Sequence, residues 1–281
     1  MKMINNLKGA KPPKVITDLR HLVYSGAEQF GDKTLYFYKD NSGKIAEYSY
    51  TKLRDEVTAI GTAWAKLGIA GKNVAVSGDT HPRYIASYLA TVTVNGCIVP
   101  IDKELTTDST AGFLQLSECV AFVYTAAQNE KARELEKLCP DIRYFIAIQP
   151  GEDFRFSDKV LTMDEVVEMG ERALAGGDTS YLGTQLEMEK MSALLFTSGT
   201  TGTSKGVMLS HKNLRAATNA SVLSMSYDDR NTFVSVLPPH HSYEITCGHL
   251  AIMDLGAQIF INDSLKHVLK NFKSFQPNAL M

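Results

Sequence analysis

The sequence has little of what disulfide-stabilised or membrane-spanning proteins need. Its four cysteines, Cys97, Cys119, Cys139 and Cys247, are widely spaced and form no Cys-x-x-Cys pair. Such cysteines are typical of reduced core residues in a cytoplasmic protein. No apolar stretch reaches the roughly 20 residues that a membrane-spanning helix needs. We therefore expect a cytoplasmic protein without a transmembrane segment, and attachment to the periphery of a membrane is left open.

An excess of one charge is also lacking. Lysine and arginine number 29, aspartate and glutamate 31, and the formal net charge is −2. No run of like charge suggests a nucleic acid or a membrane surface as a partner. The first residues, MKMINNLKGAKPPK, are basic but lack the apolar core of a signal peptide. With 281 residues, 44% of them hydrophobic, the chain can bury a large core in one domain or two closely joined ones.

What the sequence does contain is a regular alternation of apolar strands and amphipathic helices. Two short strands around DNSGK predict a hairpin near residues 35–50. Continuous apolar runs then recur between helical patterns, at 74–77, 98–101, 121–124 and 144–148. Strands of this kind, separated by helices, indicate a parallel sheet that is covered on both faces. We expect a doubly wound α/β fold with mainly parallel sheets.

A looser region divides this pattern. It begins with PGEDFRFSDK and ends with AGGDTSYLGTQ, so we expect residues 1–175 to form a first α/β portion and residues 176–281 a second. The second portion resumes with a strand at 193–196 and a helix at 213–223. The sequence ends on a new apolar run, 278–281, which we interpret as the first half of a strand. We therefore expect the chain to be a fragment of a larger domain.

A loop of small polar residues, TSGTTGTSKG, occupies residues 197–206 between the strand at 193–196 and the helix at 213–223. Such a loop lies at the carboxyl edge of a parallel sheet, where open α/β folds bind ligands. Its glycines let backbone N–H groups approach an anion, its hydroxyl groups add donors, and the following helix would add its positive end. The predicted polyphosphate site consists of Thr197, Ser198, Gly199, Thr200, Thr201, Gly202, Thr203 and Lys205.

Two other interpretations of this loop were weighed. A flexible linker of the same composition rarely joins a buried strand to an amphipathic helix. A Walker A loop needs Gly-Lys followed by Ser or Thr, whereas here Ser204 precedes Lys205 and Gly206 follows it. An ordinary kinase or GTPase is therefore disfavoured.

Residues 197–206 closely resemble the phosphate-loop signature of the adenylate-forming superfamily, which includes acyl-CoA synthetases, luciferases and peptide-synthetase adenylation domains. Ser204 stands where that family most often has proline, which changes the stiffness of the loop. Residues 48–53, 95–102 and 237–244 resemble three further elements of the family, so the resemblance covers essentially the whole chain. Glu244, three residues after His241, is similar to the form found in long-chain fatty acyl-CoA synthetases.

The resemblance implies a fatty acid–CoA ligase that uses ATP and Mg²⁺ to form an acyl-adenylate and then transfers the acyl group to coenzyme A. Lys205 and His241 would be catalytic. His241 would place the substrate carboxylate near the α-phosphate, and Glu244 would orient that carboxylate or close the start of a helix. The adenine, ribose and magnesium contacts of the family are expected beyond residue 281. The chain alone is therefore predicted to be inactive without the rest of its polypeptide.

Alternatives remain open at this point. The residues PHHSYEITCGH could form a metal site or a purely structural cap, but their spacing fits no common zinc pattern and we predict no metal ligands. His240 and His249 receive no role. The chain could also belong to another adenylating enzyme, one that loads a carrier protein or an amino acid. A non-catalytic module that binds a nucleotide or an acyl group is the third possibility.

Overall fold

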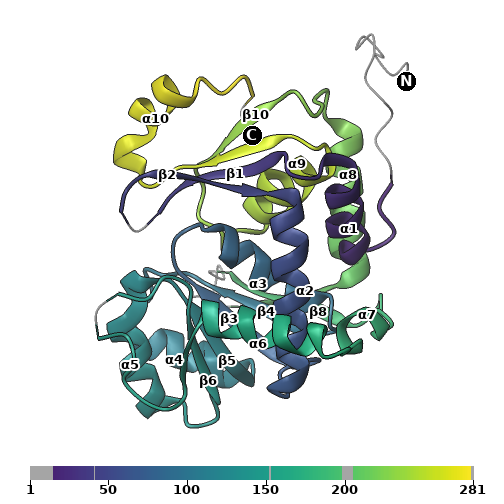
Figure 1. The fold of residues 1–281 in the computed structure, drawn as a ribbon. Coiled ribbons are helices and arrows are strands. Elements are labelled where there is room, and N and C mark those ends of the chain that lie inside the picture. Colours follow the sequence, from purple (N-terminus) through teal and green to yellow (C-terminus); the bar gives the residue numbers. More distant parts are fainter. Residues whose placement is uncertain (1–14, 41, 152, 198–204, 280–281) are drawn as a thin grey trace.

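A computed structural model of the chain describes residues 15–279 except 41, 152 and 198–204. Its strands form two sheets, one above the other, with α2 (Tyr50–Lys66) and α3 (Pro82–Val92) between them (Figure 1). Sheet A has the order β10-β11-β1-β2 and sheet B the order β7-β6-β5-β3-β4-β8-β9. No helix among the described residues is long and apolar enough to cross a bilayer.

The bounds of the elements follow the sequence pattern closely. The strands of sheet A are β1 (Thr34–Lys39), β2 (Ile45–Ser49), β10 (Thr232–Ser235) and β11 (Gln258–Ile261). Those of sheet B are β3 (Asn73–Ser77), β4 (Cys97–Ile101), β5 (Cys119–Tyr124), β6 (Tyr144–Ala147), β7 (Val160–Thr162), β8 (Met191–Thr197) and β9 (Lys205–Ser210). The remaining longer helices are α1 (Leu19–Phe30), α4 (Thr107–Leu116), α5 (Asn129–Leu138), α6 (Met163–Ala175), α8 (His211–Ser224), the π-helix η2 (Glu244–Ala251) and α10 (Val268–Phe275).

The prediction of an α/β fold with mainly parallel sheets is confirmed. Within sheet B every pairing from β7 to β8 is parallel, and successive residues of β3 face two different cores. Val74 and Val76 pack into the core that α2, α3 and α6 share with sheet A, whereas Ala75 packs into the core under α4 and α5. Both faces of this sheet are therefore covered, as its continuous apolar strands require.

Two strands of sheet B were not predicted. β7 lies inside the looser region and adds an edge strand parallel to β6. β9 follows the small-residue loop and pairs antiparallel with β8, with Thr197 opposite Lys205. The prediction that the loop passes directly into a helix was therefore wrong. α8 begins only at His211, after β9, so its positive end does not follow the loop.

Residues from both predicted portions take part in each sheet. Sheet A joins β1 and β2 to β10 and β11, and sheet B joins β3–β7 to β8 and β9. The predicted strand at 278–281 lies partly outside the described residues. The backbone N–H groups of Asn278 and Ala279 donate to the carbonyl of Thr232, the first residue of β10.

A buried polar network ties the helices between the sheets to sheet A. Glu56 on α2 accepts three hydrogen bonds from the guanidinium of Arg83 on α3, with N–O distances of 3.1, 3.1 and 3.3 Å. It also accepts one from Tyr48 of β2, at 2.8 Å. Arg83 reaches Asp164 on α6 with its remaining nitrogen, at 2.7 Å. The Glu56 carboxylate and the Arg83 guanidinium thus link β2, α2, α3 and α6.

Candidate functional site

The carboxyl ends of β3 and β4 form a topological switch point in sheet B. β3 continues into α3 on the face shared with sheet A, whereas the neighbouring β4 continues into α4 on the opposite face. Open α/β sheets bind ligands at such a reversal. Asp79, just past β3, and Lys103, just past β4, form an ion pair of 2.6 Å here. The hydrogen bond to Asp79 raises the pKa of Lys103, which keeps this lysine cationic at neutral pH.

The base of the predicted phosphate loop adjoins this switch point. β8 runs parallel to β4, with Ala193 opposite Ile98, so the carboxyl end of β8 at Thr197 lies on the same edge of the sheet as the carboxyl end of β4. Thr197 and Lys205 are both exposed and face each other across the β8–β9 ladder. The Thr197 hydroxyl donates to the Lys205 carbonyl at 3.5 Å. The other residues of the predicted site, Ser198, Gly199, Thr200, Thr201, Gly202 and Thr203, lie outside the described residues.

A segment from sheet A reaches the same edge. After β10 the chain passes through two prolines to His240, whose Nε2 lies 3.8 Å from a carboxylate oxygen of Asp102. The rings of His240 and His241 have centroids 4.3 Å apart, and His241 is exposed. Burial lowers the pKa of His240 more than Asp102 raises it, so the imidazole is neutral at pH 7. His241 therefore lies beside His240, which contacts Asp102 at the carboxyl end of β4.

Glu244 has a different setting from its neighbour His241. Its side chain is 4% exposed, and its carboxylate accepts a hydrogen bond from the Ser235 hydroxyl. His249 lies 3.6 Å from the same carboxylate oxygen and 3.2 Å from the Tyr36 hydroxyl on its other side. Glu244 is thus part of a buried polar group with Ser235, His249 and Tyr36. Its predicted contact with a substrate stays a prediction.

Burial sets the protonation of this group. It raises the pKa of Glu244 to about 7, although the Ser235 hydrogen bond lowers it, and it lowers the pKa of His249 to about 3. At pH 7 a neutral imidazole therefore stands beside a carboxyl that is about half ionised. Gly248 makes room for that carboxyl, because a Cβ at this position would lie 2.8 Å from it.

The histidine-rich segment divides between two places. His240 points to Asp102 at the sheet edge, whereas His249 is fully buried beside Tyr36. Among the residues that the structure describes, no group of three metal-ligating side chains is brought together. A magnesium ion at this edge would need most of its ligands from phosphate oxygens and water, which is its usual coordination in nucleotide sites.

The residues present suit a phosphate chain. Lys205 supplies a cation and Thr197 a hydroxyl group at the base of the loop, next to a sheet edge that carries the further cation Lys103. Gly206, the next residue of β9, lies close over Leu194, since a Cβ there would be 3.0 Å from its side chain.

Two cavities lie elsewhere. One, of about 310 Å³, is at the amino end of β5 and includes Cys119 and Cys139. Burial raises the pKa of Cys119 to about 12, so its thiol is protonated and not nucleophilic. The other, of about 590 Å³, is an open hollow between α1 and residues 184–188. Neither contains a residue of the predicted site.

Sequence reasoning missed several residues of this edge. Asp102 closed one of the recognised motifs but received no role, and Lys103 follows it directly. A charged residue just after each apolar strand was the signal that could have identified both, because carboxyl ends of parallel strands share one edge. Tyr36 and His249 are separated by 213 positions, and no sequence pattern connects them.

Comparison with known proteins agrees with the fold and the motif. The profile of a family described as AMP-binding enzyme matches residues 23–281. A crotonobetaine/carnitine–CoA ligase of Salmonella paratyphi A is 27% identical over 226 residues, which is 80% of this chain and 42% of that protein. The corresponding ligase of Escherichia fergusonii is 28% identical over 233 residues, 79% of this chain and 42% of that protein. The chain thus spans less than half the length of these curated relatives.

Solved structures share the fold at low identity. An anthranilate CoA ligase in complex with anthranoyl-AMP superposes with a TM-score of 0.80 at 15% identity, covering 95% of this chain and 50% of that one. The A domain of a carboxylic acid reductase from Segniliparus rugosus, in complex with AMP and a co-purified carboxylic acid, gives 0.75 at 18% identity. That match covers 92% of this chain and 47% of the reductase domain.

Proposed function

The chain belongs to the AMP-binding enzyme family, within the adenylate-forming superfamily, and we propose that it forms the phosphate-binding part of an acyl-CoA ligase. In this proposal a carboxylate attacks the α-phosphate of ATP to give an acyl-adenylate and pyrophosphate, and the thiol of coenzyme A then displaces AMP. The observation that carries the proposal is the position of Thr197 and Lys205, the described ends of the phosphate-loop motif, at the end of β8 and near the switch point of sheet B.

Each described residue has a distinct part in this proposal. Lys205 and Thr197 bind the phosphates and stabilise the charge that develops on the leaving pyrophosphate. His241, which lies beside His240 at the edge near Asp102, orients the attacking carboxylate. Magnesium, held mainly by the phosphates, would neutralise further charge there. Adenine and ribose contacts would come from a longer polypeptide that contains this chain.

A fatty acid is the proposed carboxylate. The support is the likeness of residues 237–244 to long-chain fatty acyl-CoA synthetases. The named relatives are crotonobetaine/carnitine–CoA ligases, so the test must include those acids as well. The assay is exchange of labelled pyrophosphate into ATP, followed by acyl-CoA formation, with a panel of fatty acids and with crotonobetaine and carnitine. Exchange with none of these acids, in a polypeptide that extends beyond residue 281, would refute the proposal. Exchange with an amino acid, or transfer to a carrier protein, would favour another adenylating enzyme.

Lys205→Ala gives the sharpest test of the phosphate site. Loss of one preorganised group that stabilises developing charge typically costs about 10²–10³ in the rate of the chemical step. We expect the exchange rate to fall by that factor while the Michaelis constant for the acid changes little. Lys212→Ala is the matched control, because Lys212 lies on α8 and pairs with Glu189 at 2.6 Å. Equal rates in the Lys205 variant and the wild type would remove this lysine from the mechanism.

A further inference from the structure

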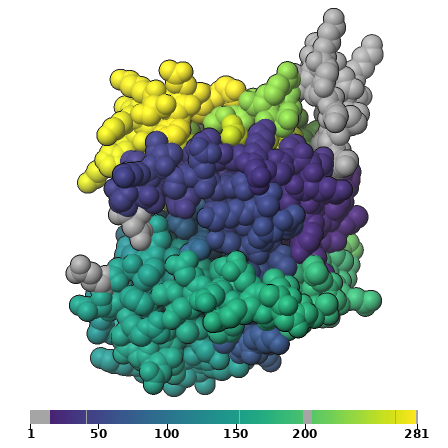
Figure 2. Space-filling view, in the orientation of Figure 1, coloured from purple at the N-terminus to yellow at the C-terminus, as the bar shows by residue number. Residues whose placement is uncertain are grey.

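Helix α10 presents an unusual outer surface at one corner of the molecule, next to the β1–β2 hairpin (Figures 1 and 2). Its inner side packs on sheet A through Phe275, which stacks on Phe260 with ring centroids 3.4 Å apart, and through the buried Asn271. Its outer side carries Leu269, Lys270 and Lys273, and Lys266 lies in the short 3-10 helix Leu265–His267 just before it; we call these four residues the basic face. These positions are spaced as neighbours on one side of a helix.

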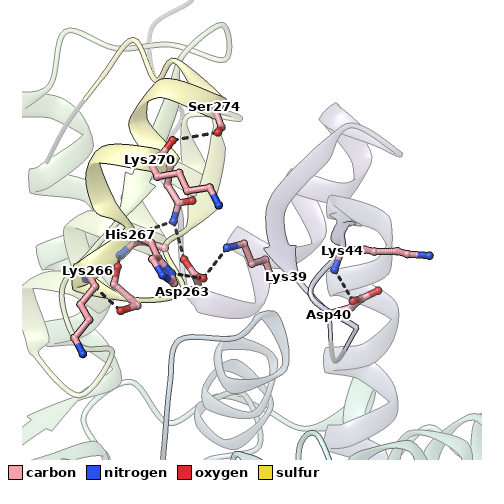
Figure 3. Close-up of polar contacts among 11 residues, drawn as sticks. Lys39, Asp40, Lys44, Asp263, Lys266, His267, Lys270 and Ser274 are labelled. Carbon is pink, nitrogen blue, oxygen red and sulfur yellow. Dashed lines mark hydrogen bonds and ion pairs between the residues drawn. The ribbon is translucent and has the colours of Figure 1, made fainter.

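The charge of the basic face is not balanced nearby. Residues 264–279 include no aspartate or glutamate. In the part of the chain that the structure describes, no ion pair involves Lys266, Lys270 or Lys273. The acidic residue that precedes the helix, Asp263, is already engaged by Lys39 of β1 at 2.6 Å and by His267 at 2.9 Å, as Figure 3 shows. All three lysine side chains are therefore exposed without an acidic partner among the described residues.

A large apolar side chain lies among these lysines. Leu269 is 79% exposed, although a leucine on a helix that packs against a sheet is ordinarily buried. The adjoining hairpin adds a second exposed apolar side chain, since Ile45 is 53% exposed. Ile45 pairs with Lys39 across the hairpin, and so lies on the side of sheet A that α10 covers. Lysines and apolar side chains thus share one surface.

We infer that the basic face, with Ile45, is a docking surface for a membrane that contains anionic lipids. Lysine ammonium groups would pair with lipid phosphates while Leu269 enters the boundary between headgroups and acyl chains. Charge complementarity selects an anionic partner, and the exposed leucine selects a lipid surface. A nucleic acid or an acidic peptide would use the lysines but leave Leu269 in water. This inference does not depend on the proposed enzymatic activity.

The test is binding of the full 281-residue chain to vesicles of phosphatidylcholine with and without phosphatidylglycerol. We expect binding only to the anionic vesicles, and weaker binding as salt increases. Replacing Lys266, Lys270 and Lys273 together by glutamine should lower the partition coefficient about 100-fold, from about fivefold for each lysine near an anionic surface. Leu269→Ser should lower it about tenfold, because the apolar contact is lost while the charge is kept.

Matched controls use exposed residues on other surfaces. The triple change of Lys52, Lys72 and Lys137 to glutamine alters the net charge equally, and Leu116→Ser removes a leucine that is 71% exposed on α4. Both controls should bind within about threefold of the wild type, because their sites lie outside the docking surface. Equal losses in the controls, or no binding to anionic vesicles, would overturn the inference.

The basic N-terminal segment needs a control of its own. Lys2, Lys8, Lys11 and Lys14 lie in the first fourteen residues and are also attracted to anionic lipid. A variant with these four lysines changed to glutamine should retain vesicle binding that still depends on Leu269. Two results would contradict the docking surface: loss of all binding in that variant, or competition by heparin together with no effect of Leu269→Ser. The second result would indicate a soluble polyanion as the partner.

Discussion

Gly170→Ala should destabilise the protein because α6 packs against α2 at backbone distance. Gly170 lies in α6, and a Cβ added there would be 1.9 Å from the carbonyl oxygen of Ala59 on α2. The same Cβ would be 2.5 Å from the carbonyl carbon and 2.8 Å from the Cα of Ala59. All three atoms belong to the backbone, so no change of rotamer can relieve the overlap. The two helices would have to separate.

The size of the effect follows from the required movement. A carbon and a carbonyl oxygen approach to about 3.3 Å at closest, so the helices must separate by more than 1 Å. Overpacking of this kind costs about 1–3 kcal/mol in side-chain cores, and a rigid backbone neighbour places the cost at the upper end. Alanine regains about 1 kcal/mol of helix propensity over glycine. We expect a net loss of about 2 kcal/mol in the free energy of unfolding.

Gly112→Ala is the matched control for this experiment. Gly112 lies in α4, and no atom would be within 4 Å of its added Cβ, so only the propensity term remains. Its free energy of unfolding should rise by about 1 kcal/mol. Urea unfolding, followed by circular dichroism, would measure both variants against the wild type. A Gly170→Ala protein as stable as Gly112→Ala would show that α6 can move without cost and would refute the reasoning.

Two further predictions concern buried carboxylates. Glu56→Ala should lower the free energy of unfolding by about 3–5 kcal/mol, because it leaves the Arg83 guanidinium without its main partner; a loss below about 1 kcal/mol in urea unfolding would contradict this. Burial raises the pKa of Glu244 from 4.5 to about 7. Between these two pH values the folded protein binds more protons than the unfolded chain, so the free energy of unfolding falls by up to about 3 kcal/mol as the pH rises. In Glu244→Gln this pH-dependent loss of stability should vanish. If the free energy of unfolding changes in the same way in the variant and the wild type between pH 5 and pH 8, the prediction is wrong.

Local pattern predicted most of the fold. The hairpin of β1 and β2 and the strands β3 to β6 follow from short-range alternation and continuous apolar runs, signals that are present in the sequence itself. β9 was missed because its apolar residues, Val207 to Leu209, form a run of only three without the alternation of a half-buried strand. β9 forms a strand because it pairs with β8, and this structural context is not visible in the local sequence pattern.

The charged surface shows a similar limit. The absence of a run of like charge in the sequence predicts no basic surface. Lys266, Lys270 and Lys273 are separated along the chain and become neighbours only when α10 forms. Leu269 falls within an apolar helical pattern, and its exposure depends on which side of α10 packs against Phe260. The sequence pattern alone does not determine which side of α10 packs against sheet A.

The candidate site depends on how the two sheets are held together, more than on contacts within the site. Lys205 belongs to sheet B, whereas His241 follows β10 of sheet A. The contact described between these segments, His240 to Asp102, spans 3.8 Å and involves a neutral imidazole, so it contributes little. The stronger link is remote: Glu56 and Arg83 join β2 of sheet A to helices that pack on sheet B. Alignment of reactants in the proposed reaction would therefore depend on residues that contact no substrate, because a small shift between the sheets changes the position of His241 relative to the phosphate loop.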